Sequence, residues 1–160
     1  MSGTPRRACV RALAKLNLSL KVLNKRPDGY HELRTVFQTI SLADTIDIEF
    51  TPGRRPEVEL VSDVDIPDNL VERTARLAME ALRIRGRARF RLTKRIPAGA
   101  GLGGGSSDAA AVLLGLPALA GKRADLETLM DLGGRLGSDV PFFLLGGAAV
   151  ALGRGTELYP

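Results

Sequence analysis

The stretch PAGAGLGGGSSDAAAVLLG, residues 97–115, passes from a glycine-rich run to an apolar segment within a few positions. Five glycines lie between positions 99 and 105. Glycine loses more conformational entropy on folding than any other residue, and a simple turn into a helix needs only one or two. Bare backbone lets several N–H groups converge on an anion, and a helix N-terminus adds partial positive charge. We therefore predict a phosphate-binding loop that opens a helix at about Ser107, with Ser106, Ser107 and Asp108 where helix caps are favoured.

Three familiar nucleotide-binding motifs do not account for this loop. The Walker A motif needs serine or threonine after Gly-Lys, whereas residues 121–123 read Gly-Lys-Arg. Gly99, Gly101 and Gly104 match the spacing G-x-G-x-x-G, but the expected order of strands and helices does not fit a dinucleotide-binding fold. The H-R-D and D-F-G motifs of protein kinases do not occur in the sequence.

The composition indicates one globular domain with an anionic partner. The chain has 160 residues, of which 44% are hydrophobic and 26% charged, enough for a single core. Lysine and arginine outnumber aspartate and glutamate by 23 to 18, a net charge of +5, which favours a nucleic acid or a phosphorylated small molecule. Cys9 is the single cysteine, and no apolar stretch has the length of a membrane span. We therefore expect a cytoplasmic protein without a cleaved signal.

The hydrophobic pattern predicts an α+β fold. In chain order we expect a half-buried strand at 16–22, extended segments at 33–50 and 57–61, a helix at 69–82 that Gly86 ends, a strand at 87–93, helices from 107 and at 125–136, and an extended apolar segment at 142–152. The arginines between 87 and 91 alternate with apolar residues, as on the solvated face of a strand. This order lacks the regular alternation of a doubly wound sheet.

The glycine-rich stretch closely resembles the phosphate-binding motif of the GHMP kinases. AKLNLSLKVLNKRPDGYHEL, residues 14–33, and LGSDVPFFLLGGAAVALGRG, residues 136–155, are similar to segments of those members that phosphorylate a cytidine diphosphate sugar alcohol for isoprenoid precursors. The resemblance implies ATP and Mg²⁺ as cofactors and a mixed sheet with helices on one side, similar to the ribosomal protein S5 domain 2-like fold. Residues 1–160 would be the N-terminal, ATP-binding domain. The family's C-terminal domain would lie outside the chain, and the piece alone would have little activity.

The resemblance also assigns the nucleotide site. It implies that the loop and two flanking residues bind ATP, namely Asn69, Lys94, Pro97, Ala98, Gly99, Ala100, Gly101, Leu102, Gly103, Gly104, Gly105, Ser106 and Ser107. Protein ligands of the metal stay unassigned.

The residues proposed for catalysis and for the acceptor come from the other two segments. Lys15 and Asn17 stand on the polar face of the first strand, opposite Leu16, Leu18 and Leu20, and a lysine there is ordinarily just solvated. Here the resemblance implies that Lys15 acts in phosphoryl transfer and that Asn17 orients the substrate.

Asp139 precedes the apolar residues 140–143, so its carboxylate could be held dry at the edge of the core, although it could equally bond the local backbone. The resemblance makes Asp139 the general base for the 2-hydroxyl of the substrate. It also implies that Tyr30 and His31 hold the cytosine.

Two other readings stay open at this stage. One is a GHMP kinase with a different alcohol substrate, against which only the Tyr30-His31 pair argues. The other is a basic nucleic-acid-binding module. A kinase domain should gain thermal stability from ATP by mass action, whereas an RNA binder should show a steep salt dependence for RNA.

Overall fold

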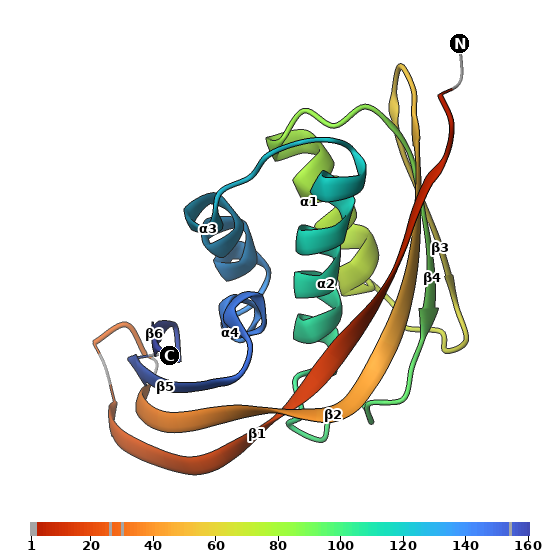
Figure 1. The fold of residues 1–160 in the computed structure, drawn as a ribbon. Coiled ribbons are helices and arrows are strands. Elements are labelled where there is room, and N and C mark those ends of the chain that lie inside the picture. The colour runs from red at the N-terminus through yellow and green to blue at the C-terminus, as the bar shows by residue number, and fades with distance from the viewer. Residues whose placement is uncertain (1–2, 26, 30, 154) are drawn as a thin grey trace.

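Two long antiparallel strands run the length of the molecule. The computed structural model describes residues 3–25, 27–29, 31–153 and 155–160. Strand β1 (Arg6–Lys25) pairs with strand β2 (His31–Pro52) from end to end, as Figure 1 shows. Gly29 lies between them with φ of 85°, a conformation that favours glycine in a tight turn.

The other strands complete a mixed sheet on β2. The sheet order is β3-β4-β2-β5-β6, and β1 lies against β2 off this path. Strand β3 (Pro56–Ser62) is parallel to β4 (Gly86–Thr93), which pairs antiparallel with the second half of β2. Strand β5 (Ala148–Gly153) pairs antiparallel with the first half of β2 and with β6 (Glu157–Tyr159).

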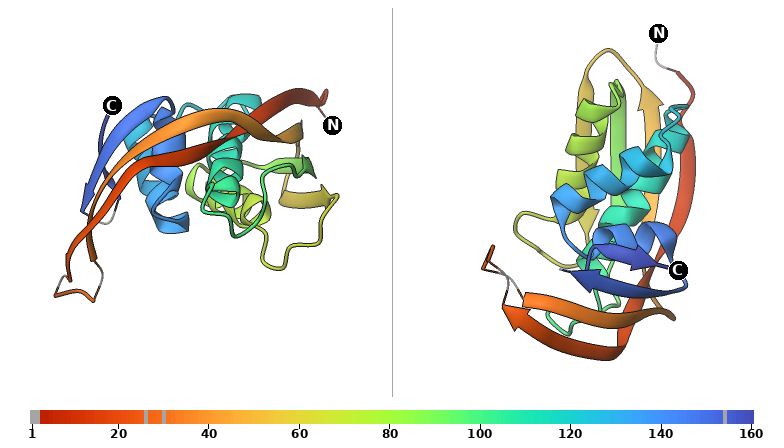
Figure 2. Two further views of the ribbon diagram at one scale, coloured as in Figure 1. Left: turned by 90° about the horizontal axis from the view of Figure 1, so that it is seen from below. Right: turned by 90° about the vertical axis from the view of Figure 1, so that its left-hand side faces the viewer.

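Helices cover one side of this sheet, as Figure 2 shows. They are α1 (Leu70–Ala81), α2 (Gly104–Leu119), α3 (Leu126–Leu136) and α4 (Val140–Leu145). On β4, Ala88, Phe90 and Leu92 are buried toward the helices, and the alternate residues are exposed. The expected α+β class and the solvated arginine face are thus confirmed.

Several expected boundaries are wrong. Helix α2 begins at Gly104 rather than Ser107, and its N-cap is Gly103, so Ser106, Ser107 and Asp108 lie inside the first turns instead of capping them. Helix α1 ends at Ala81 with Leu82 as its C-cap, close to the expected end, but Gly86 opens β4 instead of ending the helix. Residues 140–145 form helix α4, and only the end of the apolar segment at 142–152 is extended.

A β-bulge in β1 overturns the expected facing of the first strand. Asn17 pairs with Phe37 and Ser19 with Val36, so Leu18 is an extra residue. Beyond it Leu20 pairs with Thr35, and cross-strand partners share a face. Leu20 therefore lies on the same face as Asn17.

The strand is also not half-buried there. All four apolar residues of the expected buried face are exposed, namely Leu16, Leu18, Leu20 and Val22. The buried part of β1 lies earlier, around Ala12 and Ala14. Among the described residues, no helix is both long enough and apolar enough to span a membrane.

Candidate active site

The glycine-rich loop alternates between ordinary and left-handed backbone. Gly99, Gly101 and Gly103 have φ of 72°, 74° and 70°, which L side chains rarely adopt. Gly104 has ordinary helical geometry, but a Cβ there would lie 3.0 Å from Ile96 Cγ2. Left-handed backbone thus requires glycine at three of these positions, and the lack of space requires it at Gly104. The helix that follows directs its N-terminus at the loop.

The residues predicted to bind ATP line one pocket. The loop from Pro97 to Ser106, together with Asn69 and Lys94, surrounds a cavity of about 340 Å³ beside the N-terminus of α2. Ser107 is buried on the other side of the helix turn, where it lines a smaller cavity with Thr39 and Phe143. The structure thus gathers the predicted nucleotide residues, except Ser107.

The loop is bonded directly to the strand that carries Lys15. The Lys15 backbone N–H donates to the Leu102 carbonyl at 3.0 Å. A Cβ on Gly103 would lie 3.3 Å from Lys15 Cγ and 2.7 Å from the Phe143 ring. Figure 1 shows the N-terminal end of α2 beside the middle of β1.

The ammonium group of Lys15 lies among three groups that favour a cation. Lys15 is only 5% exposed, and its Nζ donates to Asn17 Oδ1 at 2.6 Å. Nζ also lies 3.6 Å from Asp139 Oδ2 and 4.7 Å from the centre of the Phe37 ring. A lysine that is solvated and idle is therefore the wrong description of this position.

A buried threonine sets the orientation of Asn17. The Asn17 amide nitrogen donates to Thr35 Oγ1 at 2.8 Å, and the Thr35 hydroxyl donates to the Ser19 carbonyl at 2.7 Å. With its nitrogen directed at Thr35, the Asn17 amide presents its oxygen to Lys15. Thr35 is 1% exposed and also holds the backbone just beyond the bulge.

Asp139 faces Lys15 rather than its own helix. It occupies the N-cap position of α4, but its side chain makes no capping hydrogen bond within the described part of the chain. Its carboxylate is 32% exposed, so it is not held dry as expected. The turn that carries it borders α2, because a Cβ on Gly137 would lie 3.9 Å from Ser106 Oγ. The local-backbone reading of Asp139 is therefore not supported.

Lys94 is held by two buried carboxylates. Its Nζ donates to Asp108 Oδ2 at 2.8 Å and to Asp44 Oδ2. Burial raises the pKa of the Asp108 carboxyl to about 7, against the opposing effect of Lys94. Burial also works against the Lys94 ammonium, but its hydrogen bonds to Asp108 and Asp44 prevail and raise the pKa of Lys94.

The remaining predicted residues lie at two separate places. Asn69 caps α1, because its Oδ1 accepts from the Val71 backbone N–H at 2.9 Å, and it also lines the loop cavity. His31 begins β2 at the far end of the hairpin, opposite Lys25. Tyr30 lies outside the described residues. His31 is therefore not brought to the loop, and the assignment of the Tyr30-His31 pair to cytosine stays a prediction.

Sequence reasoning missed Thr35 and Asp44. Both are polar residues that are fully buried in β2. Asp44 occupies the same set of alternate positions as the apolar residues Ile46 and Ile48. A carboxylate buried in a strand needs a partner, and that conflict is the signal that could have indicated Asp44. Thr35 gives no comparable signal, because threonine is common in strands.

Comparison with known proteins finds similar sequences and similar folds. The model of the family described as GHMP kinases N terminal domain matches residues 69–147, which include the whole loop and Asp139. This part of the chain is thus similar to the N-terminal domain of GHMP kinases. Solved GHMP kinases share the fold even at low identity: Methanococcus jannaschii mevalonate kinase is 14% identical with a TM-score of 0.71, over 96% of this chain and 55% of that one.

Three more similar proteins carry names of one enzyme. A protein of Solibacter usitatus called 4-diphosphocytidyl-2-C-methyl-D-erythritol kinase is 66% identical over 99% of this chain and 50% of its own length. A Geobacillus protein of the same name is 46% identical over 96% of this chain and 54% of its length. A crystal structure of 4-(cytidine 5'-diphospho)-2C-methyl-D-erythritol kinase is 47% identical with a TM-score of 0.84, over 96% of this chain and 55% of that one. The chain thus spans about half the length of the relatives it matches.

Proposed function

We propose that this chain is the nucleotide-binding half of a kinase that transfers the γ-phosphoryl group of ATP to the 2-hydroxyl of 4-diphosphocytidyl-2-C-methyl-D-erythritol, in the non-mevalonate isoprenoid route. The names of the relatives support the substrate. The observation that carries the chemistry is the position of Lys15, whose backbone bonds the loop while its ammonium lies 3.6 Å from Asp139. Phosphoryl transfer depends mainly on positioning and charge stabilisation, which this arrangement provides.

Each residue has a separate part in the proposed transfer. The N–H groups of the loop and of the first turn of α2 bind the phosphates. Asp139 accepts the proton of the acceptor hydroxyl as that oxygen forms its bond to the γ-phosphorus and the bond to the ADP oxygen breaks. Lys15 balances the charge that develops between the carboxylate and the phosphoryl group, and Asn17 and Thr35 hold Lys15 in place.

Magnesium belongs to this proposal because it neutralises phosphate oxygens in ATP chemistry. Mg²⁺ keeps several waters and is bound through substrate phosphates with few protein carboxylates. Within the described ranges no cluster of three or more His, Cys, Asp or Glu side chains could hold a metal ion. The residues therefore fit an ion that is held chiefly by triphosphate oxygens and water.

The substrate and the full rate need more than the residues of this chain. The relatives are about twice as long. The Asp139 side chain is 32% exposed, and residues 97–101 of the loop are exposed. We propose that the remaining half of such a protein completes the acceptor site and excludes water. We place the reaction in the cytoplasm, where the exposed thiol of Cys9 stays reduced.

Nucleotide binding and base catalysis can be tested separately. Mg-ATP should raise the melting temperature of the 160-residue chain, because it binds the folded state. The substitution corresponding to Asp139→Asn in the full-length Solibacter usitatus relative should lower kcat by about 10²–10⁴-fold, the range for loss of a general base. The same change at exposed Asp131 is the matched control. If Mg-ATP does not raise the melting temperature, the proposed nucleotide site is wrong. If the Asp139 variant turns over at the wild-type rate, the proposed role of Asp139 as general base is wrong.

A further inference from the structure

Two buried carboxylates and a lysine whose side chain is 10% exposed meet beside the glycine-rich loop. Asp44 comes from the middle of β2, Lys94 follows β4, and Asp108 lies in the second turn of α2. Asp44 and Asp108 are 0% and 2% exposed. Buried charges are retained only where they are paired and hydrogen-bonded, so this cluster has a specific structural use.

Asp44 holds the chain where it enters the loop. Its Oδ1 accepts from the backbone N–H groups of Arg95 and of Ile96, the latter at 2.8 Å. The Lys94 backbone N–H donates to Asp63 Oδ1 at 3.0 Å. The three residues before the loop are therefore fixed by carboxylates from two other segments.

Lys94 connects this entry to the exit of the loop. Its ammonium joins Asp44 to Asp108, which lies four residues after the helix begins. A Cβ on Gly104 would lie 3.2 Å from Lys94 Nζ and 3.0 Å from Ile96 Cγ2. The end of β4 and the start of α2 are thus in contact, with no room for a side chain between them.

Between these two anchors the loop has little support of its own. Gly99 and Gly101 are surrounded by open space, since a Cβ on either would meet nothing within 4 Å among the described residues. The backbone contact from this stretch to another element is the bond from Lys15 to Leu102. The spacing of the two ends therefore determines the shape of the phosphate cradle.

We propose that Asp44, Lys94 and Asp108 are positioning residues that fix the two ends of the glycine-rich loop and thereby set its affinity for a nucleoside triphosphate. The effect on affinity rests on the proposed function. Lys94 lines the loop cavity, but its ammonium is shared between two carboxylates. Asp44, at 0% exposure, acts only through other groups.

Hydrogen exchange of the unliganded chain tests the anchor without reference to ATP. Lys94→Met removes the central charge, and Asp44→Asn weakens the entry bonds. Both should speed the exchange of amides between residues 98 and 103, while Arg91→Met on the exposed face of β4 should leave it unchanged. Unaltered exchange in both folded variants overturns the proposal. Asp108→Asn, which keeps the shape of the side chain, carries the test if Lys94→Met does not fold.

Calorimetry with Mg-ATP then separates positioning from direct contact. Each of Lys94→Met, Asp44→Asn and Asp108→Asn should raise the Kd by about tenfold or more, the scale of loss when supporting partners of a binding group are removed. The double variant Asp44→Asn/Lys94→Met should lose no more than the worse single one, because the two act as one unit. Loss of binding confined to Lys94→Met would make Lys94 a direct ligand and overturn the proposal. If the wild-type chain itself does not bind ATP, the proposed function fails, and the exchange experiment still decides the anchor.

Discussion

Individual glycines of the loop are required for different physical reasons. Gly103 is left-handed and is also packed against Phe143 and Lys15, whereas Gly99 and Gly101 are left-handed in open space. The need for bare backbone could be inferred from the sequence, because five glycines in seven residues are costly without a use. The constraint on each individual glycine could not be inferred from the sequence. Gly103 contacts Phe143, which is distant along the chain, and Gly104 contacts Ile96, which the loop folds back onto.

Gly103→Ala should destabilise the chain and impair nucleotide binding. Left-handed backbone alone costs an alanine about 1–2 kcal/mol, and the new Cβ would lie 2.7 Å from the Phe143 ring. Gly134→Ala is the matched control, since Gly134 is in α3 with open space around it among the described residues. There alanine should stabilise by up to about 1 kcal/mol. Urea unfolding measures both, and equal effects at the two positions would contradict this account.

Asp108 should make stability depend on pH in a direction unusual for an aspartate. Burial raises the pKa of its carboxyl from 3.8 to about 7 in the folded chain. The folded state therefore holds this proton more tightly than the unfolded state does. The resulting stabilisation is complete below the unfolded pKa and is lost as the pH rises through the folded pKa.

The comparison of wild type with Asp108→Asn isolates this contribution. The stability of the wild type relative to the variant should fall between about pH 4 and pH 7 and change little above that. Titrating groups that do not interact with Asp108 cancel in the difference, whereas Asp44 and Lys94 are coupled to it. Urea midpoints across this range provide the measurement, and curves that stay parallel would show that the Asp108 pKa is not raised.

Catalytic candidates were accessible from the sequence where a motif carries them, as for Lys15 and Asp139. Thr35 and Asp44, which hold Asn17 and Lys94 in place, were not. Asp44 and Lys94 are 50 residues apart, and Thr35 is 18 residues from Asn17. No local pattern links such pairs, because the contact exists only after β2 has paired with β1 and β4.

Among the elements, those with long regular patterns were predicted and those shaped by tertiary contacts were not. Strand β4 alternates throughout, and α3 begins at its capping residue Asp125 as expected. Helix α4 consists of the six apolar residues VPFFLL. A short apolar run has no periodicity that distinguishes a helix from a strand. The bulge at Leu18 has no local signal either, since it follows from the register with β2.

Helix α1 offers a way to separate a structural from a nucleotide role of Asn69. Asn69→Ala should cost about 1 kcal/mol because it removes the N-cap. Asn69→Ser should largely retain stability, because serine accepts the same bond from the Val71 N–H. Thermal unfolding measures the cap, and the Kd for Mg-ATP measures the cavity contact. Weaker binding by the folded Asn69→Ser variant would support the predicted contact, and unchanged binding would limit Asn69 to capping.

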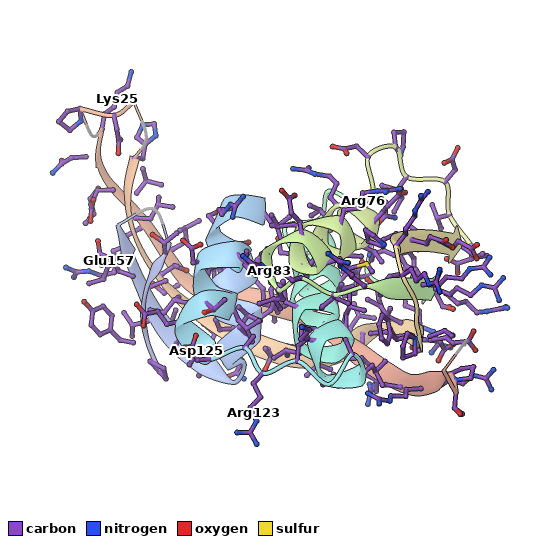
Figure 3. All side chains as sticks on the ribbon, turned by 90° about the horizontal axis from the view of Figure 1, so that it is seen from above. Lys25, Arg76, Arg83, Arg123, Asp125 and Glu157 are labelled. Atoms are coloured by element: carbon purple, nitrogen blue, oxygen red, sulfur yellow. The ribbon has the colours of Figure 1, made fainter. Side chains whose placement is uncertain are left out.

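For the molecule as a whole, several arginines of the outer sheet face are paired with carboxylates. On the outer sheet face Arg87 and Arg89 bond Glu59, and Arg7 bonds Glu49. Figure 3 shows the labelled cations Lys25, Arg76 and Arg123 on separate parts of the molecule. These ion pairs offset part of the positive charge that contributes to the net charge of +5.

Binding to single-stranded RNA should accordingly be weak and should change little with salt. A protein that neutralises several phosphates shows a steep fall of log K with log salt, with a slope near −0.7 per phosphate for single strands. Fluorescence anisotropy with a labelled oligonucleotide across a salt series measures this slope. A slope of several units would revive the nucleic-acid alternative, and Mg-ATP in the same assay would show whether the two ligands compete.

The backbone hydrogen bond from Lys15 to Leu102 links the strand that carries the lysine to the glycine-rich loop. Whatever draws the cradle inward around a donor also pulls on the strand that presents the ammonium to the acceptor. If a nucleotide shifts the loop, this bond would carry the shift to the backbone of Lys15.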